Sequence, residues 1–292
     1  MLNEVSINFV NLGIKFNDLG SSISIFGFDI AFYGIIIAIG MIVGILIALR
    51  EAKVTGQDPG LYVDFALYVI IASIIGARLY YVILEWDQYQ GDFLKIINIR
   101  NGGLAIYGGI IAAVITCVIF AKIRKVSFWK MTDTACLGLV AGQIIGRWGN
   151  FFNREAFGDY TNGLFAMQIK LSDARGVVTE KMMNHLVDVN GVSYIQVHPT
   201  FLYESLWNVG VLICLLIFKK HKKFDGEVFL WYVWGYALGR VWIEGLRTDQ
   251  LIIGFLNVPI SQLLSAILLV VVGVFWIYKR VKIRKQRNLT ID

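Results

Sequence analysis

Residues 30–49 have the sequence IAFYGIIIAIGMIVGILIAL, which contains no charged side chain. A helix needs about 20 mostly apolar residues to cross a bilayer, so this stretch predicts a transmembrane helix. The composition of the whole chain agrees, because 57% of its 292 residues are hydrophobic and 16% are charged. A soluble domain carries roughly 25% charged residues. So few charges cannot cover a water-exposed surface, which excludes an ordinary soluble protein.

Six further apolar stretches have the same character. They run approximately over residues 61–84, 104–121, 132–147, 201–218, 228–246 and 259–278. Each is long enough, or nearly long enough, to cross the hydrocarbon core as a helix. We therefore predict an all-α integral membrane protein of seven transmembrane helices, in which residues 1–292 form a single polytopic membrane domain.

Lysine and arginine concentrate in alternate loops between these stretches. More than half of the 27 basic residues follow the first, third, fifth and seventh stretches. Basic loops stay in the cytoplasm, so this alternation predicts an extracytoplasmic N-terminus, a cytoplasmic C-terminus and a basic cytoplasmic tail at residues 279–292. Topology and contact with anionic lipid then explain the net charge of +6, and a nucleic-acid partner is not expected.

One long connection is too polar to lie in the membrane. Residues 149–199 contain the alternating sequence AMQIKL at 166–171, and Asn-Gly pairs at 162–163 and 190–191. Alternation of apolar and polar residues favours β-strands, and Asn-Gly pairs favour tight turns. We predict a small extracytoplasmic head with short strands, inserted between the fourth and fifth spans.

The sixth stretch carries charged residues that a simple apolar span does not need. Four residues spaced by four, four and three share one helix face: Tyr236, Arg240, Glu244 and Arg247. A charge at the bilayer centre costs about 2.5–3.5 kcal/mol on insertion scales. These side chains must therefore face a partner, a cavity or lipid headgroups. One interpretation is a functional site, and the alternative is an ion pair of Glu244 with Arg240 or Arg247 that serves packing alone.

The end of the fourth stretch, residues 146–158, has the sequence GRWGNFFNREAFG. Its glycines permit close backbone approach and sharp turns. Arg147 and Asn150 are three residues apart and can share a helix face. Arginine presents a planar fork of donors that matches phosphate oxygens, and amide groups add neutral hydrogen bonds. The segment indicates an anion site, and the alternative is a polar helix end that Trp148 anchors at the interface.

A third polar segment precedes the fifth stretch. His198 stands where the helix would begin, and Glu204 and Asn208 are four residues apart, so they can face one side of that helix. A lone histidine at a helix mouth forms caps or hydrogen bonds more often than it performs direct chemistry.

Three weaker candidates lie in the first three stretches. Tyr33 is in the first stretch, and paired glycines flank Tyr107 at the start of the third. Those glycines indicate either a tightly packed site wall or helix–helix packing. Arg78 in the second stretch is either a counter-ion or a residue whose charged end extends to the membrane surface.

Together these segments resemble the bacterial phosphatidylglycerol–prolipoprotein diacylglyceryl transferase family. Residues 146–158 meet all eight fixed positions of the family pattern G-R-x-G-N-F-x-N-x-E-x-x-G. The segment at His198 and the charged face of the sixth stretch also resemble the family in order and spacing. The resemblance implies two catalytic residues, Arg147 and Arg240. It implies a set of substrate-binding residues: Tyr33, Tyr107, Asn150, Asn153, Glu155, Gly158, His198, Glu204, Tyr236, Glu244 and Arg247.

The resemblance also implies an activity and a location. An enzyme of the bacterial plasma membrane would transfer the diacylglyceryl group of phosphatidylglycerol to the lipobox cysteine thiol of a prolipoprotein signal peptide. A thioether would form and glycerol phosphate would leave. The two arginines would bind the phosphate and stabilise the charge that grows on the leaving group. Their positive field would also lower the pKa of the substrate thiol, which is ordinarily near 8.5.

One position departs from the family. Many members have a histidine, considered as a general base, where this chain has Tyr107. Tyrosine has a pKa near 10 and is a poor base at neutral pH, so we expect Tyr107 to hydrogen-bond lipid or thiol instead.

Other classes of protein and site are less compatible with the sequence. The three cysteines lie in apolar stretches, so we expect no metal site, and the reaction requires no cofactor. One alternative function is a polytopic transporter whose buried charges line a pathway, which predicts internal repeats that the sequence does not show. The other is a lipid-binding membrane protein without chemistry.

Overall fold

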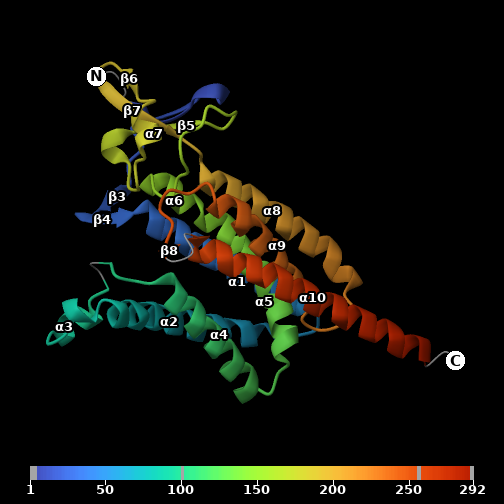
Figure 1. Ribbon diagram of the computed structural model, residues 1–292. Coiled ribbons are helices and arrows are strands. Elements are labelled where there is room, and N and C mark those ends of the chain that lie inside the picture. The colour runs from blue at the N-terminus through green and yellow to red at the C-terminus, as the bar shows by residue number, and fades with distance from the viewer. Residues whose placement is uncertain (1–4, 100–101, 255–257, 290–292) are drawn as a thin grey trace. The chain divides into compact units, whose positions relative to one another are not determined.

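Helices dominate the computed structural model, which describes residues 5–99, 102–254 and 258–289 (Figure 1). The long helices are α1 (Phe32–Val54), α2 (Pro59–Leu84), α4 (Ile106–Ile123), α5 (Phe128–Gly146), α8 (Thr200–Phe218), α9 (Glu227–Glu244) and α10 (Ile260–Leu289). Each of them overlaps one of the predicted stretches. Among the described residues, α1, α2, α4, α8 and α10 are long and apolar enough to cross a membrane. Polar side chains in α5 and α9 lower the hydropathy of those two helices.

Shorter elements connect the long helices. The short helices are η1 (Val10–Leu12), η2 (Trp86–Gln88), α3 (Phe93–Ile97), α6 (Trp148–Asn153), η3 (Leu171–Asp173), α7 (Glu180–Met183) and η4 (Lys219–His221). Two antiparallel hairpins are formed by β3 (Ser22–Ile25) with β4 (Phe28–Ala31), and by β8 (Ile252–Ile253) with β9 (Val258–Pro259).

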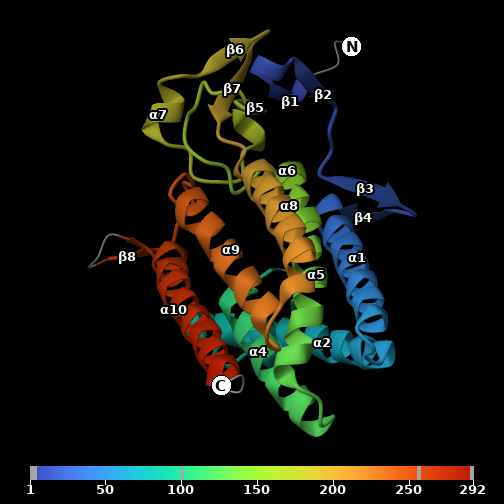
Figure 2. The ribbon, with the colours of Figure 1, turned by 90° about the vertical axis from the view of Figure 1, so that its right-hand side faces the viewer.

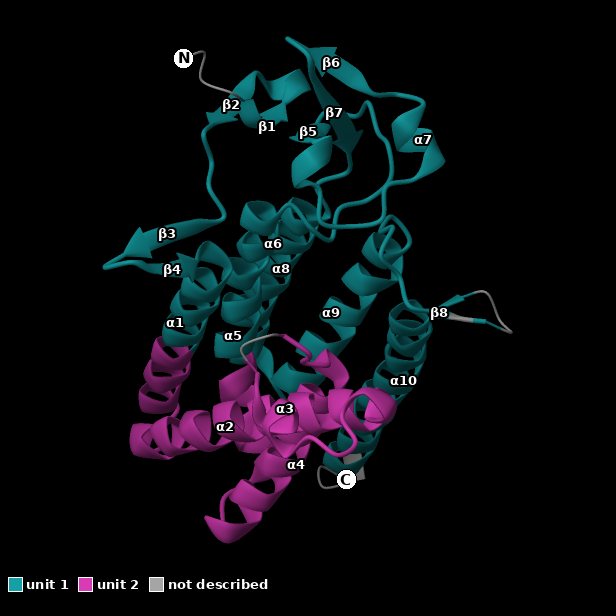
Figure 3. Ribbon diagram, turned by 90° about the vertical axis from the view of Figure 1, so that its left-hand side faces the viewer, with its two compact units in different colours: residues 1–44, 137–292 teal, residues 45–136 magenta. Residues whose placement is uncertain are grey.

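The chain divides into two compact units, one of residues 1–44 and 137–292 and a second of residues 45–136 (Figure 3). In the second unit α2 packs against α4. A Cβ atom on Gly76 would lie 2.7 Å from the carbonyl oxygen of Gly108, so the two backbones can approach only because both residues are glycine. Helix packing therefore explains Gly108, which follows Tyr107 in the sequence.

Arg78 anchors a loop of the second unit. Its guanidinium is buried and donates to the carbonyl oxygens of Lys95, Ile96, Gly102 and Gly103 at 2.7–2.9 Å. Arginine has five N–H donors, and four hydrogen bonds to carbonyls occupy most of them. Within the described residues the partners of Arg78 are backbone carbonyls, so the counter-ion interpretation is wrong, and the interpretation that its charged end extends to the membrane surface stays a prediction.

The polar part of the first unit is a five-stranded antiparallel sheet in the order β2–β1–β5–β7–β6. Three strands come from the predicted head: β5 (Met167–Lys170), β6 (Val187–Val189) and β7 (Val192–Val197). The other two, β1 (Val5–Phe9) and β2 (Ile14–Asn17), come from the N-terminal segment, and Ile7 pairs with Ile169. The sheet thus extends beyond the predicted limits of 149–199, and the fold contains more strand than an all-α description allows.

A hydrophobic core joins this sheet to the helices that follow. Ile7, Ile169 and Ile195 of the sheet are fully buried, and they belong to the same core as Phe151 of α6 and Phe201 of α8. Burial of apolar surface stabilises this junction. It therefore places the start of α8 and the segment around α6 directly beneath the sheet (Figure 2).

The first unit has a basic end opposite the sheet. Helices α8, α9 and α10 pack side by side, with the sheet at the end where α8 begins (Figure 2). At the other end, the fully buried Glu227 pairs with Arg280 and accepts a hydrogen bond from Trp276 Nε1 at 2.8 Å. Helix α10 continues into the predicted basic tail and ends at Leu289. Residues 290–292 of that tail lie outside the described residues.

Candidate active site

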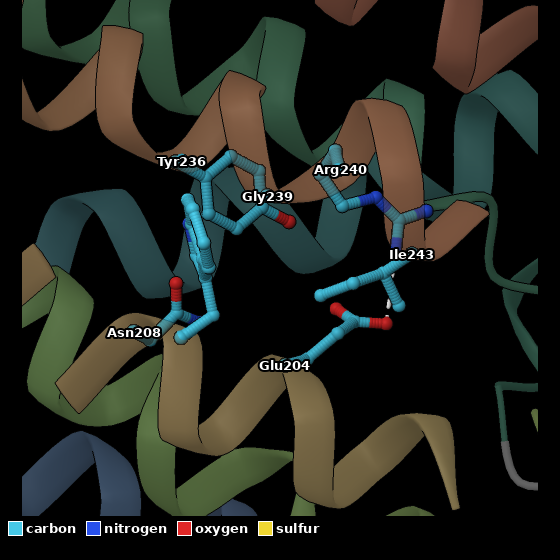
Figure 4. A pocket seen from close by; sticks show the side chains of 7 residues that line it. Glu204, Asn208, Tyr236, Gly239, Arg240 and Ile243 are labelled. Carbon is cyan, nitrogen blue, oxygen red and sulfur yellow. Dashed lines mark hydrogen bonds and ion pairs between the residues drawn. The ribbon is translucent and has the colours of Figure 1, made fainter. Parts of the chain in front are cut away.

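Glu204 is the centre of a charged cluster in the first unit. Its side chain is 3% exposed and lies in the second turn of α8. Arg147 Nη2 lies 2.6 Å from Oε2, and Arg240 Nη1 lies 3.0 Å from Oε1, as Figure 4 shows for the second pair. Arg247 Nη1 lies 3.7 Å from Oε1. Three guanidinium groups, one from residue 147 and two from residues 240–247, therefore meet at one carboxylate.

Two more carboxylates complete the cluster. Arg240 also pairs with Glu244, one helical turn away on α9, which confirms one of the two predicted ion pairs. Arg247 donates to both oxygens of Asp249 at 2.9 and 2.8 Å. Helix α9 ends at Glu244, so the prediction that Arg247 shares its face is wrong. Arg247 instead reaches Glu204 from the turn that follows the helix.

The predicted site did not include Asp249. The sequence signal that could have found it is the presence of a carboxylate only two residues after Arg247. Burial acts to raise the pKa of Asp249, but the hydrogen bonds and charge of Arg247 outweigh burial and hold that pKa below its ordinary value. Asp249 is therefore ionised at neutral pH. The cluster therefore contains three arginines and three carboxylates.

Arg147 lies at the junction of α5 and α6, and some N–H groups of its guanidinium are unoccupied within the described residues. Nη2 contacts Glu204 and donates to the Tyr236 hydroxyl at 3.4 Å, whereas Nε and Nη1 donate to no group in the described part of the chain. Hydrogen bonds fix the junction against α8. Trp148 Nε1 donates to Ser205 Oγ at 3.3 Å, and Ser205 Oγ donates to the Ile144 carbonyl oxygen at 3.0 Å. Arg147 is thus held in place while part of its donor fork remains available to an anion.

The other predicted residues of the 146–158 segment form a folded turn beside Arg147. Asn150 Nδ2 donates to Glu155 Oε1 at 2.9 Å, so these two side chains pair with each other. The ring of Tyr33 covers Gly149, where a Cβ atom would lie 2.8 Å from the ring. Asn153 is the last residue of α6 and is partly buried. Binding of substrate by these residues stays a prediction.

Gly158 joins the three polar segments that the sequence singles out. Its backbone N–H donates to the His198 carbonyl oxygen at 2.9 Å. A Cβ atom at this position would lie 2.7 Å from the carbonyl oxygen of Leu246, which follows α9, and 2.8 Å from the Cβ of His198. Only glycine fits without displacing a neighbour, which gives Gly158 a packing reason independent of substrate.

His198 takes part in hydrogen bonding at the start of α8. Its Nδ1 lies 3.2 Å from the Tyr203 hydroxyl. Burial lowers the pKa of His198, the charge of Lys181 lowers it further, and Asp159 opposes both. The imidazole is therefore neutral at pH 7, which suits a hydrogen-bonding role. Tyr107 lies in α4, in the second unit, so its assignment to the same site stays a prediction.

A narrow cleft between α8 and α9, with no room for a water molecule in this structure, adjoins the charged cluster (Figure 4). Its lining residues are Glu204, Trp207, Asn208, Tyr236, Gly239, Arg240 and Ile243. The Trp207 ring lies against the bare backbone of Gly239, and its Nε1 donates to the Gly235 carbonyl oxygen at 2.9 Å. The sequence places Asn208 on the same helix face as Glu204 but assigns it no role.

Comparison with known proteins places this geometry in a family. The family model for prolipoprotein diacylglyceryl transferase matches residues 21–278. The chain belongs to this family. A phosphatidylglycerol–prolipoprotein diacylglyceryl transferase of Listeria innocua serovar 6a is 45% identical over 248 residues, which is 85% of each chain. Its counterpart in Bacillus cereus strain ZK is 45% identical over 246 residues, which is 84% of this chain and 86% of the relative.

Family membership agrees with the apolar helices of the chain. A prolipoprotein diacylglyceryl transferase with five helices apolar enough to cross a bilayer is a bacterial membrane protein. The residues that the family model matches include the whole charged cluster, from Arg147 to Asp249. The predicted resemblance is confirmed.

Proposed function

We propose that the protein transfers the diacylglyceryl group of phosphatidylglycerol to the lipobox cysteine thiol of a prolipoprotein signal peptide. The observation that carries the proposal is the convergence of Arg147 and Arg240 on the buried Glu204, beside a cleft. Placing a charged arginine in apolar surroundings costs free energy, so such arginines usually have a function. Their planar forks are suited to the phosphate of the lipid.

The reaction is a substitution at the glycerol carbon that carries the phosphate. A bond forms between the cysteine sulfur and that carbon, and the bond between the carbon and the phosphate oxygen breaks. The electron pair stays on the phosphate oxygen, glycerol phosphate leaves, and the thiol proton is released to water. The transition state therefore gains negative charge on the leaving phosphate, and this is the charge that the enzyme must stabilise.

The cluster supplies that stabilisation with guanidinium groups that carboxylates already hold in place. Arg147 would bind the phosphate through Nε and Nη1, which no described group occupies. Arg240 is held from two sides by Glu204 and Glu244, so its charge stays aimed at the cleft. Donors that are already oriented contribute more than donors that must reorganise during the reaction. A guanidinium group close to the sulfur also favours the thiolate form of the substrate cysteine.

The proposed topology follows from the first unit. We place the sheet and the charged cluster on the extracytoplasmic side and the basic end on the cytoplasmic side, with seven spans including α5 and α9. The positive-inside rule supports this orientation, because Arg280 and the lysines of η4 lie at the end opposite the sheet. The charges pair with one another at one end of α8 and α9, which favours a site over a transport pathway.

The test is direct transfer by purified protein. A peptide with a lipobox cysteine is incubated with the protein and phosphatidylglycerol, and mass spectrometry detects the thioether-linked diacylglycerol adduct. Arg147→Ala and Arg240→Ala should each lower the rate by about a hundredfold or more, because each removes a donor from the developing charge. Arg124→Ala is the control, since Arg124 is 45% exposed and pairs with Asp64 outside the cluster. Full activity in both cluster variants would contradict the proposal.

A further inference from the structure

The side-chain amide of Asn208 is a buried donor without an acceptor. The residue is 2% exposed, and it lines the cleft at the end where Tyr236 lies, away from Arg240 (Figure 4). Its Nδ2 has no hydrogen-bond partner within the described residues. Buried polar groups are almost always paired because an unpaired one is unfavourable. A buried donor of this kind beside a narrow cleft therefore indicates where a ligand that opens the cleft places an acceptor.

Asn208 lies one turn further from the sheet than the charged cluster does. Glu204 is four residues nearer the start of α8, and at 1.5 Å per residue the two levels are about 6 Å apart. On α9, which packs against α8, Tyr236 stands one turn from Arg240 in the same direction. Seen from the sheet, the site therefore presents guanidinium groups first and the Asn208 amide below them.

A glycerophospholipid presents its groups in the matching order. Its phosphate lies outermost, the glycerol carbons follow, and the two ester carbonyls lie closer to the hydrocarbon core. With the phosphate at Arg147 and Arg240, the acceptor that comes level with Asn208 is an ester carbonyl. A carbonyl oxygen accepts hydrogen bonds and carries no charge, which suits an amide donor away from the ion pairs.

We infer that Asn208 Nδ2 donates a hydrogen bond to an ester carbonyl of the diacylglyceryl group and so selects diester lipids. The inference rests on the proposed function, since it takes the lipid phosphate to bind at the arginines. This single polar contact would set how deeply the lipid lies in the cleft. It also gives the enzyme a reason to discriminate against phospholipids whose chains are joined by ether bonds, because an ether-linked chain has no carbonyl.

The experiment compares two forms of phosphatidylglycerol. One carries ester-linked chains, and the other carries ether-linked chains of the same length. Leaving a buried donor unpaired lowers kcat/KM by roughly 5- to 150-fold, so the unmodified protein should prefer the diester lipid by that factor. In Asn208→Leu, kcat/KM for the diester lipid should fall until the ratio of the two lipids is close to one. Ile213→Leu is the control, because Ile213 is an exposed apolar residue of the same helix, and it should keep the original ratio.

Binding of the same two lipids, measured by native mass spectrometry, separates this inference from the proposed function. If the unmodified protein transfers from neither lipid, the proposed function fails, and a diester preference in binding that Asn208→Leu abolishes still supports the inference. Asn208→Ala takes the place of Asn208→Leu if the leucine variant does not fold. A ratio near one in the unmodified protein, or an unchanged ratio in a folded Asn208 variant, overturns the inference.

Discussion

Replacing Glu204 by glutamine would remove the negative charge that holds the arginine cluster together while keeping the shape of the side chain. Glu204 is 3% exposed, and its partners Arg147 and Arg240 are 20% and 13% exposed. Removing one partner of a buried ion pair costs about 3–5 kcal/mol, because the remaining charge stays buried. Glutamine keeps one acceptor oxygen, and the hydrogen bond to that oxygen offsets about 1 kcal/mol of this loss. The expected loss of stability is therefore about 2–4 kcal/mol.

Thermal unfolding of the purified protein in detergent measures this loss. For a chain of this size, 1 kcal/mol shifts the unfolding temperature by roughly 2 °C, so Glu204→Gln should unfold about 4–8 °C below the unmodified protein. The scan rate must be the same for all variants, since irreversible unfolding makes the apparent temperature depend on it. Asp225→Asn is the control. Asp225 is 50% exposed and pairs with Lys222 at 3.0 Å, and such a surface pair contributes about 1 kcal/mol or less.

A second measurement distinguishes a charge effect from simple loss of packing. Glu204→Gln adds one net positive charge to the cluster, so added glycerol phosphate should raise the unfolding temperature of the variant more than that of the unmodified protein. An unfolding temperature within about 1 °C of the unmodified protein, together with full transfer activity, would refute the central role of Glu204.

Three further perturbations test separate parts of the site. Tyr107→Phe should keep most of the transfer activity, because tyrosine is a poor base at neutral pH; complete loss of activity in a folded variant that still binds lipid would contradict this. Gly158→Ala should lower stability by about 1–3 kcal/mol through the contacts its Cβ would make. Gly210→Ala is the control, because a Cβ at Gly210 meets open space, and it should be neutral or slightly stabilising. Equal unfolding temperatures of the two variants would show that the close approach at Gly158 is not needed. His198 has a lowered pKa, so below about pH 6.5 the unfolded chain binds more protons than the folded one, and stability should fall as the pH drops through that range. His198→Gln should show a smaller fall. Identical curves of stability against pH for the two proteins would rule out this contribution.

The positions of the long helices were predictable because they depend on local sequence. The predicted stretch at 201–218 differs from α8 by one residue, and the other stretches overlap their helices with end differences of a few residues. The largest difference is at the end of the last stretch, predicted to stop at 278, because α10 continues to Leu289. The apolar stretch ends at the first basic residues of the tail, but the helix continues beyond that point, where Arg280 pairs with the buried Glu227.

The sheet and the centre of the site depend on contacts between distant residues, which a single sequence does not reveal. Strands β1 and β2 were missed because Ile7 pairs with Ile169, far away along the chain. The sequence singled out Arg147, Arg240 and Glu244 by their motifs, and helical spacing predicted a pair of Glu244 with Arg240 or Arg247, of which the structure shows the first at hydrogen-bonding distance.

What the sequence by itself determined is the membrane class, the places of the helices and the chemical types of the site residues. These are encoded within single segments by apolar length and by motif. Only the tertiary structure decided that Glu204 would hold three arginines and that Asn208 would be left with an unpaired donor. Both outcomes depend on how α8 packs against α9 and against the junction of α5 and α6, because the energy of a buried charge or amide is set by the partners that packing brings within reach.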